Sequence, residues 1–261
     1  MPENKIEIKN LYVSFGSNQV INNLDLIVRK GETKVVIGRS GVGKSVLLKC
    51  IVGILKPDQG SIKIDGVEVT DLKEKDYNKL RMKMGMVFQG GALFDSMTVE
   101  ENVTFVLNEF FNFDPRVVYD RMKESLAMVG LQGLGRLSPA KLSGGMKKRV
   151  GIARALCMEP ELILYDEPTD EVDPVTGDSL TNLINKLRDK LNVTSVVVTH
   201  DMSAAYKVGD NIAMLYRGKV IADGTPEEIR NTHHPVVQQF VNGKARGPIM
   251  DDENLLLDYG V

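Results

Sequence analysis

The chain has 261 residues, of which 43% are hydrophobic and 26% are charged, and its formal net charge is −2 at pH 7. This length allows one large domain or two small ones, and the slightly acidic balance argues against a protein that binds duplex nucleic acid. No stretch reaches the roughly 18 apolar residues that a membrane-spanning helix needs, and the polar start, MPENKIEIKN, does not have the pattern of a signal peptide.

Hydrophobic periodicity predicts an open α/β sheet that is interrupted by a helical insertion at about 95–155. In chain order we expect strands at 5–14 and 20–30, a buried strand at 34–38, a buried helix at 45–55, a turn and strand within 57–69, and a buried strand at 84–89. Residues 98–158 are mostly helical, with breaks at 112–115 and 133–139. Strands at 161–168 and 194–201 flank a helix at 174–191, a hairpin covers 211–224, and the tail from 236 begins helical. The cysteines, Cys50 and Cys157, lie in apolar runs without metal spacing, so we expect buried free thiols.

A phosphate-binding loop is the strongest motif. The segment GRSGVGKS, residues 38–45, fits the pattern G-x-x-x-x-G-K-[ST] and lies between a predicted buried strand and a predicted helix. Glycines let backbone N–H groups face the phosphates, the lysine reaches the β and γ phosphates, and the serine hydroxyl suits Mg²⁺, which prefers oxygen ligands. The predicted nucleotide-binding residues are Gly38, Arg39, Ser40, Gly41, Val42, Gly43, Lys44, Ser45 and Val46.

A pair of acids ends the predicted strand at 161–168. Asp166 and Glu167 follow an apolar run, and ligands of α/β proteins collect at such strand ends. We expect Asp166 to hold Mg²⁺ through water and Glu167 to act as general base toward the attacking water. Alone, the pair could equally be a cap at a strand end, but beside a phosphate-binding loop the catalytic interpretation is favoured.

A second anion-binding turn lies at 142–150, LSGGMKKRV, where a serine and two glycines precede a helical run. Unpaired N–H groups at a helix start bind anions. The chain thus carries two phosphate-binding turns, and the second, on the helical insertion, cannot easily fold back onto residues 38–45.

These motifs together resemble the ATP-binding cassette (ABC) ATPases over nearly the whole chain, through residues 38–45, Gln89, LSGGM at 142–146, LYDEP at 164–168, Asp173 and His200. The resemblance implies an α/β P-loop NTPase with a RecA-like core, an N-terminal antiparallel β subdomain and an inserted helical subdomain. It implies a nucleotide-binding core at 1–94 and 156–235, a helical subdomain at 95–155, and a C-terminal extension at 236–261. It also implies ATP hydrolysis with ATP and Mg²⁺.

Further roles come from the same resemblance. Ser143, Gly144 and Gly145, with Asp173, are expected to contact the ATP held by a second copy of the chain, so that a homodimer forms two shared sites. Gln89 is expected to touch Mg²⁺ and the water, and His200 to contact the γ-phosphate. An aromatic side chain near residue 15 should stack on adenine, for which Phe15 fits best by spacing and Tyr12 is the alternative.

A narrower resemblance is to the ATPases of Mce/Mla-type lipid transporters, through FQGGALFDSMTVEENV at 88–103, Met146, and VVQQFVNGKARGPI at 236–249. It implies a peripheral protein on the cytoplasmic face of the inner membrane, paired with an integral-membrane permease dimer, a periplasmic lipid-binding protein and a possible small regulatory subunit. Ala92, Leu93 and Phe94 are expected to line the groove that receives a permease helix, although each could instead be a core residue.

The runner-up among transporters is the ATPase of an importer for a polar solute such as an amino acid. A soluble ABC ATPase without a permease is disfavoured by the single phosphate-binding loop, the lack of sustained heptads and the acidic pI, and a nucleotide switch that does not hydrolyse ATP is disfavoured by the intact Glu167 and His200. One departure from the family pattern is DEVD at 170–173, where Asp170 and Glu171 replace residues that are usually small. In the tail, Leu255, Leu256, Leu257 and Tyr259 suggest an apolar end that docks on a partner, although a frayed terminus is equally compatible.

Overall fold

The computed structural model describes residues 3–250. The first half of the chain forms β1 (Asn4–Phe15), β2 (Asn18–Arg29), β3 (Thr33–Ile37), α1 (Lys44–Ile51), β4 (Gln59–Ile64), β5 (Val67–Glu68), α2 (Glu74–Arg81), β6 (Met84–Val87), α3 (Val99–Phe110) and α4 (Pro115–Met128). The second half forms the 3₁₀ turn η1 (Pro139–Lys141), α5 (Gly144–Leu156), β7 (Leu162–Asp166), α6 (Pro174–Leu191), β8 (Thr194–Thr199), α7 (Met202–Val208), β9 (Asn211–Tyr216), β10 (Lys219–Gly224), α8 (Pro226–Asn231) and α9 (Pro235–Val241).

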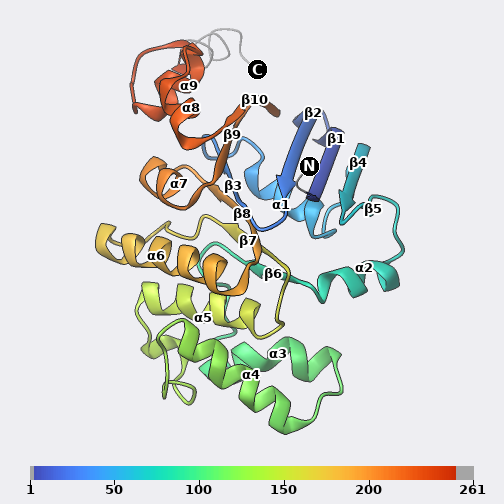
Figure 1. The fold of residues 1–261 in the computed structure, drawn as a ribbon, viewed down its shortest axis with the longest axis vertical. Helices are drawn as coiled ribbons and strands as arrows, with labels where there is room; N and C mark the ends of the chain where they lie inside the picture. Colours follow the sequence, from blue (N-terminus) through green and yellow to red (C-terminus); the bar gives the residue numbers. More distant parts are fainter. Residues whose placement is uncertain (1–2, 251–261) are drawn as a thin grey trace.

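The central sheet has six strands in the order β10-β9-β3-β8-β7-β6, and every pair is parallel except β9–β10. Its inner strands are buried on both faces, so their sequences are continuous apolar runs. Alternate residues of one strand enter different cores: Ile163 packs with the helices α5 and α6, whereas Leu162 and Leu164 pack with α1 and the N-terminal sheet. The sheet therefore separates two hydrophobic cores. Figure 1 shows α5 and α6 on one side of these strands and α1 on the other.

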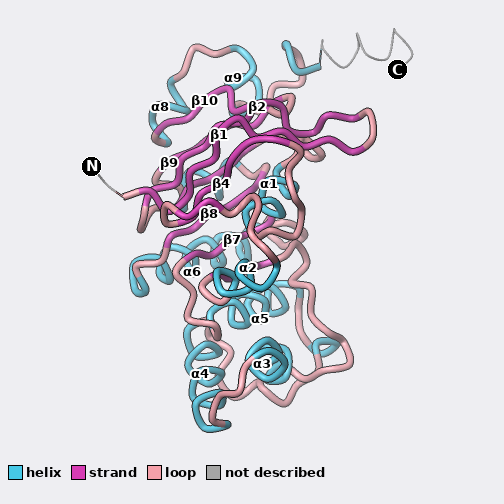
Figure 2. Tube along the Cα trace, turned by 90° about the vertical axis from the view of Figure 1, so that its right-hand side faces the viewer, coloured by secondary structure: helices cyan, strands magenta, loops and turns pink. Residues whose placement is uncertain are grey.

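The N-terminal sheet has four antiparallel strands in the order β2-β1-β4-β5. Its residues Ile6, Ile8 and Leu24 are fully or almost fully buried in the core that also contains α1. In Figure 2 these strands lie at the end of the molecule opposite α3 and α4. The phosphate-loop helix α1 is thus held between two sheets.

The helices α3, α4 and α5 gather at the far end of the molecule from the N-terminal sheet (Figure 1). The chain enters α3 through a capping box, in which Thr98 and Glu101 each bond the other's backbone N–H, and Asp114 caps α4 directly before Pro115. α5 is the link between this group and the rest, because its residues pack both on β6 and on α3 and α4.

Most expected elements are confirmed, including the helix at 174–191, which coincides with α6. The sequence patterns did not reveal α2, α7 or α8, which have six to eight residues each.

Both cysteines are buried free thiols, and burial raises the pKa of Cys50 to about 12. Within residues 3–250, no helix is long and apolar enough to cross a bilayer. The leucines and tyrosine predicted to dock, residues 255–257 and 259, lie outside the described residues.

Candidate functional site

Four parallel strands deliver the candidate residues to one edge of the central sheet. β3 ends at Ile37, directly before the phosphate loop, and β6 ends two residues before Gln89. β7 ends at Asp166, directly before Glu167, and β8 ends directly before His200. Because parallel strands place their carboxyl ends at the same edge, segments that are far apart in sequence meet there.

The phosphate loop, residues 38–45, has a backbone that requires glycine at two points. Gly43 has φ +108° and is the N-cap of α1, and a Cβ at Gly38 would lie 2.6 Å from the carbonyl oxygen of Leu215. Neither position accepts a larger residue without a shift of the backbone. The loop therefore wraps the start of α1, where N–H groups and the helix dipole favour an anion.

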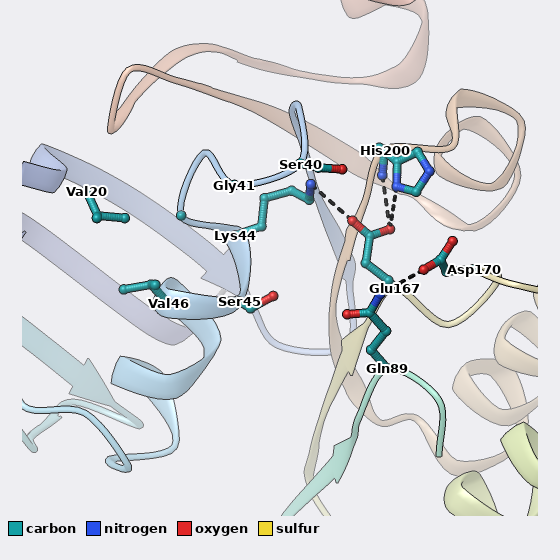
Figure 3. A pocket seen from close by; sticks show the side chains of 11 residues that line it. Val20, Ser40, Gly41, Lys44, Ser45, Val46, Gln89, Glu167, Asp170 and His200 are labelled. Carbon is teal, nitrogen blue, oxygen red and sulfur yellow. Dashed lines mark hydrogen bonds and ion pairs between the residues drawn. The ribbon is translucent and has the colours of Figure 1, made fainter. Parts of the chain in front are cut away.

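The Glu167 carboxylate joins Lys44, predicted to bind the phosphates, to His200, predicted to contact the γ-phosphate, as Figure 3 shows. Its Oε1 lies 3.0 Å from Lys44 Nζ, and its Oε2 lies 3.0 Å from His200 Nδ1 and accepts the backbone N–H of His200 at 3.2 Å. The side chain is buried, and its residue has a left-handed backbone with φ +46°. Such strain in a non-glycine residue persists only where the surroundings enforce it, which is typical of functional sites.

Ser45 and Asp166 form a second contact in the site. Ser45 Oγ donates to Asp166 Oδ1 at 2.8 Å, and burial raises the pKa of the Asp166 carboxyl, with the Ser45 hydrogen bond acting in the opposite direction. The pair offers a hydroxyl and a carboxylate oxygen beside the phosphate loop. This donor set fits Mg²⁺, which is bound by one or two protein oxygens together with phosphates and water.

A pocket of about 290 Å³ opens over the phosphate loop. Its lining residues are Val20, Ser40, Gly41, Gly43, Lys44, Ser45, Val46, Gln89, Glu167, Asp170 and His200. Within the predicted stretch 38–46, three residues do not line it. Gly38 and Arg39 instead accept hydrogen bonds from Lys44 Nζ through their carbonyl oxygens, and the Val42 side chain packs against the N-terminal core.

The adenine contact was predicted for an aromatic residue, and the structure leaves that prediction open. Phe15 is 51% exposed at the end of β1, where it pairs with Asn18 across the hairpin, but it does not line the pocket. Tyr12 is half-buried within the same strand. Val20, which sequence reasoning missed, lines the pocket from β2. Its only sequence signal was its place in a strand that follows the candidate aromatic residue.

Gln89 contacts Asp170, a residue flagged in sequence only as a departure from the family pattern. Gln89 Nε2 donates to Asp170 Oδ2 at 2.7 Å (Figure 3). The chain after Gln89 is attached to α5, because the Arg154 guanidinium donates to the carbonyl oxygens of Gly91 and Ala92 at 2.9 and 2.8 Å. The loop that follows Gln89 is therefore tied directly to α5.

The second phosphate-binding turn lies elsewhere. Ser143 is the N-cap of α5, and its hydroxyl accepts the N–H of Met146 at 3.3 Å. Ser143 and Gly144 are exposed, whereas Gly145 packs against Thr176 so closely that a Cβ would meet it at 2.4 Å. Among the described residues that line the pocket over the phosphate loop, none belongs to 142–146. This turn presents its free N–H groups to a different surface.

Asp173 caps α6 in this structure. Its carboxylate accepts the backbone N–H groups of Val175 and Thr176 and the Thr176 hydroxyl, and the hydroxyl bond is the main reason that the Asp173 pKa is lowered. The residue is exposed, and the carbonyl of nearby Glu171 lies next to the second turn, 3.9 Å from a Cβ placed on Gly144.

An apolar groove of about 460 Å³ lies on the face of β6 and α3. Ala92 and Phe94 line it together with Phe88, Phe105 and other residues, and Phe94 remains 42% exposed although its ring contacts Phe105. Leu93 differs from the expectation, because it packs against the core and does not line the groove. The backbone at Ala92 is left-handed, with φ +44°.

Comparison with known proteins gives a consistent result. The family model described as ABC transporter matches residues 21–170. Over 98% of this chain and 74% of the relative, the sequence is 40% identical to the probable ribonucleotide transport ATP-binding protein mkl of Mycobacterium tuberculosis. It is 38% identical to the intermembrane phospholipid transport system ATP-binding protein MlaF of Haemophilus influenzae, over 95% of this chain and 94% of that one. It is 40% identical to the methionine import ATP-binding protein MetN of Carboxydothermus hydrogenoformans, over 91% of this chain and 71% of that one.

Among solved structures, the ATP-binding cassette MJ0796, in a dimeric post-hydrolysis state with ADP and phosphate, has a TM-score of 0.77 and 33% sequence identity. The alignment covers 85% of this chain and 98% of that one.

Proposed function

Since this chain belongs to the ABC transporter family and is an ATPase subunit of that type, we propose that two copies close around two ATP molecules and thereby drive a membrane permease that moves phospholipid. The observation that carries the proposal is the Glu167 carboxylate, which contacts both Lys44 and His200 at the edge where four strands end. Such a constellation positions an attacking water beside a phosphate chain.

ATP would enter with its β and γ phosphates over the start of α1. Lys44 Nζ now bonds the carbonyl oxygens of Gly38 and Arg39 and the Glu167 carboxylate. A triphosphate competes for the same ammonium group, because a more highly charged oxygen cluster attracts it more strongly. When Lys44 turns to the phosphates, Glu167 is released from one partner and can accept a proton from water.

The imidazole of His200 holds the other carboxylate oxygen. Because a carboxylate only accepts hydrogen bonds, the Nδ1 proton lies between the two groups and Nε2 is left for the pocket. His200 thus orients Glu167 and offers its second nitrogen toward the γ-phosphate. In the proposed mechanism the protein positions the attacking water and stabilises the charge of the transition state, and no covalent intermediate with the protein forms.

Mg²⁺ fits the Ser45 and Asp166 oxygens, and Gln89 can add an amide oxygen from the opposite wall of the pocket. When bound, the ion neutralises charge on the β and γ phosphates during transfer. The chain's part is to hold these three oxygens beside the phosphate loop.

The second turn supports a shared site. Ser143 and Gly144 are exposed and do not line their own chain's pocket, so their free N–H groups can serve the γ-phosphate of a second copy. Gly145 and Asp173 would lie at the same interface. The dimeric state of the cassette MJ0796 supports this arrangement, in which a two-fold axis lets each copy complete the other's site.

The groove lined by Ala92 and Phe94 suits a permease segment, because it is apolar and its lining chain is bonded to α5 through Arg154. A segment seated there would act on Gln89 and on the Ser143 turn together. In this proposal the protein sits on the cytoplasmic face of the inner membrane, with a permease dimer, a periplasmic lipid-binding protein and a possible small regulatory subunit as further partners.

The chain divides, in this proposal, into a nucleotide-binding core at 1–94 and 156–235, a helical unit at 95–155 that carries α3, α4 and the Ser143 turn, and an extension from 236. Closure of the dimer would move the helical unit as a body, since α5 connects it to the core.

Phospholipid is favoured as cargo because one relative of matching length is named for intermembrane phospholipid transport. The similarity to a methionine import ATP-binding protein supports a second candidate, the ATPase of an importer for a polar solute. Purification of the chain from membranes with its permease, followed by lipid analysis of the complex, separates the two. Co-purified phospholipid and a lipid-stimulated ATPase support the first candidate, and stimulation by an amino acid supports the second.

A further inference from the structure

Asp170 is an acid in the nucleotide pocket whose role the proposed reaction does not yet explain. Its carboxylate lines the pocket and accepts the Gln89 side-chain N–H at 2.7 Å. The neighbouring acid, Glu171, is exposed and does not line the pocket. Asp170 and Glu171 therefore occupy different environments, and of these two only Asp170 touches a side chain of the site.

The contact decides which end of the Gln89 amide faces the pocket. A glutamine side chain has an oxygen and a nitrogen of similar shape, and rotation by half a turn exchanges them. A carboxylate cannot donate a hydrogen bond, so only the NH₂ end can face Asp170. The oxygen then points the other way, and Figure 3 shows it turned toward Ser45.

Both partners of this contact are fixed by the same helix, α5. Lys148 is 3% exposed, and its Nζ donates to the Glu167 carbonyl oxygen at 3.2 Å, the oxygen that also accepts the Asp170 N–H. Burial lowers the pKa of Lys148, while the nearby carboxylates, Asp170 first among them, oppose that shift. A positive charge thus lies beside Asp170 within its own chain. On the other side, Arg154 holds the backbone that follows Gln89.

We propose that Asp170 is a positioning residue, which directs the Gln89 amide oxygen toward the Mg²⁺ that Ser45 and Asp166 hold. The inference rests on the proposed function, since it concerns the metal of that site. A side chain whose orientation is fixed by a hydrogen bond to a neighbouring residue binds a metal ion more tightly than one that rotates freely. Loss of that neighbour typically weakens metal affinity about 10–100-fold.

The test measures metal-dependent nucleotide binding with no turnover. The β,γ-imido analogue of ATP is titrated into the full chain by calorimetry at several Mg²⁺ concentrations and again with a chelator. In Asp170→Ala, the Mg²⁺ concentration at half-saturation should rise about tenfold. Binding of the analogue without metal should stay within twofold of the unmodified chain.

Two matched variants exclude simpler explanations. Glu171→Gln removes the adjacent charge but no contact with Gln89, so its Mg²⁺ dependence should equal that of the unmodified chain. Gln89→Ala should raise the Mg²⁺ concentration at half-saturation about as much as Asp170→Ala does. The double variant should raise it no further than either single variant, because both residues act through one amide.

Overturning results are equally specific. If Asp170→Ala and Glu171→Gln both strengthened analogue binding with and without Mg²⁺, Asp170 would act only as a repulsive charge. If the effects of Asp170→Ala and Gln89→Ala added up, the two residues would act separately. A chain whose analogue binding gained nothing from Mg²⁺ in its unmodified form would instead contradict the proposed metal site.

Discussion

Lys44 Nζ and Glu167 Oε1 lie 3.0 Å apart, so the lysine predicted for the phosphates is paired with the carboxylate predicted as general base. Both side chains are buried, with exposures of 5% and 9%. A buried pair of this kind is costly to break unless another charge replaces the lost partner. In the proposed function, the ATP phosphates would supply that replacement, so that nucleotide entry would release Glu167 to act as the base.

Glu167→Gln should preserve ATP binding and abolish most hydrolysis. The amide retains the shape and can still contact His200 and Lys44, but it cannot take a proton from water. We expect phosphate release to fall at least about 100-fold, the lower part of the range for general base catalysis, while a closed dimer accumulates with ATP. Gel filtration with and without ATP checks the dimer. Turnover close to that of the unmodified chain would show that Glu167 is not the base.

Phe94→Glu should weaken assembly with the permease and leave the isolated ATPase unchanged. The residue is 42% exposed in the apolar groove, where a charge would be buried by any docked helix. Phe110→Glu is the matched control, because Phe110 is 72% exposed in α3 and does not line the groove. Co-purification from membranes measures the difference. Equal permease recovery with both variants would place the docking surface elsewhere.

The end of the described chain belongs to the folded core. Ile249 is 5% exposed, and its N–H donates to Gln239 Oε1 at 2.7 Å. Removal of residues 244–261 should therefore destabilise the protein by about 1.5–3 kcal/mol, the value of one buried apolar side chain. Removal of 251–261 alone keeps Ile249 and its hydrogen bond with Gln239.

The shorter truncation then tests whether the apolar end, Leu255–Leu257 and Tyr259, joins two copies. Sedimentation without nucleotide should show a shift toward monomer after removal of 251–261. The same mass over the same concentration range would rule out a docking role for these residues.

Glu161→Gln should lower stability at neutral pH and lose its effect in acid. The carboxylate lies 2.8 Å from Lys5 and 2.9 Å from Lys83, and these hydrogen bonds lower its pKa from 4.5 to about 2. A carboxyl whose pKa is lower in the folded state than in the unfolded state stabilises the folded protein at pH values above the unfolded-state pKa. This stabilisation is lost as the pH falls from about 4.5 toward 2. Because the side chain is 49% exposed, screening limits the effect to about 1 kcal/mol. Urea unfolding across this pH range measures it, and a difference independent of pH would contradict the assignment.

The phosphate loop and its strand were predictable because the motif, the strand before it and the helix after it are all local in sequence. The same holds for Asp166 and Glu167, which end an apolar run. The contacts between them were not predictable, since Lys44 and Glu167 are separated by more than a hundred residues and meet only through the strand order β3-β8-β7.

The contact of Asp170 with Gln89 and the place of Val20 in the pocket escaped sequence reasoning for different physical reasons. An acid in a loop gives no signal of the amide it will contact, and a valine in a strand is indistinguishable from an ordinary core residue. The short helix α2 was missed because only Tyr77 among its residues is buried, so it has almost no apolar periodicity. Leu93 packs against the core, which the sequence had left as the alternative, because an apolar residue in a short loop gives no signal that separates a core position from a groove position.

The most direct test of the account is nucleotide retention by a tethered dimer in which both halves carry Glu167→Gln. One half also carries Lys44→Ala and the other Ser143→Arg, so both lesions fall in one shared site and the second site stays intact. After desalting, the account predicts about one retained ATP per mixed dimer, and none when both halves carry the same lesion. Full retention with Ser143→Arg in both halves would contradict it, because ATP would then be held without the partner's turn.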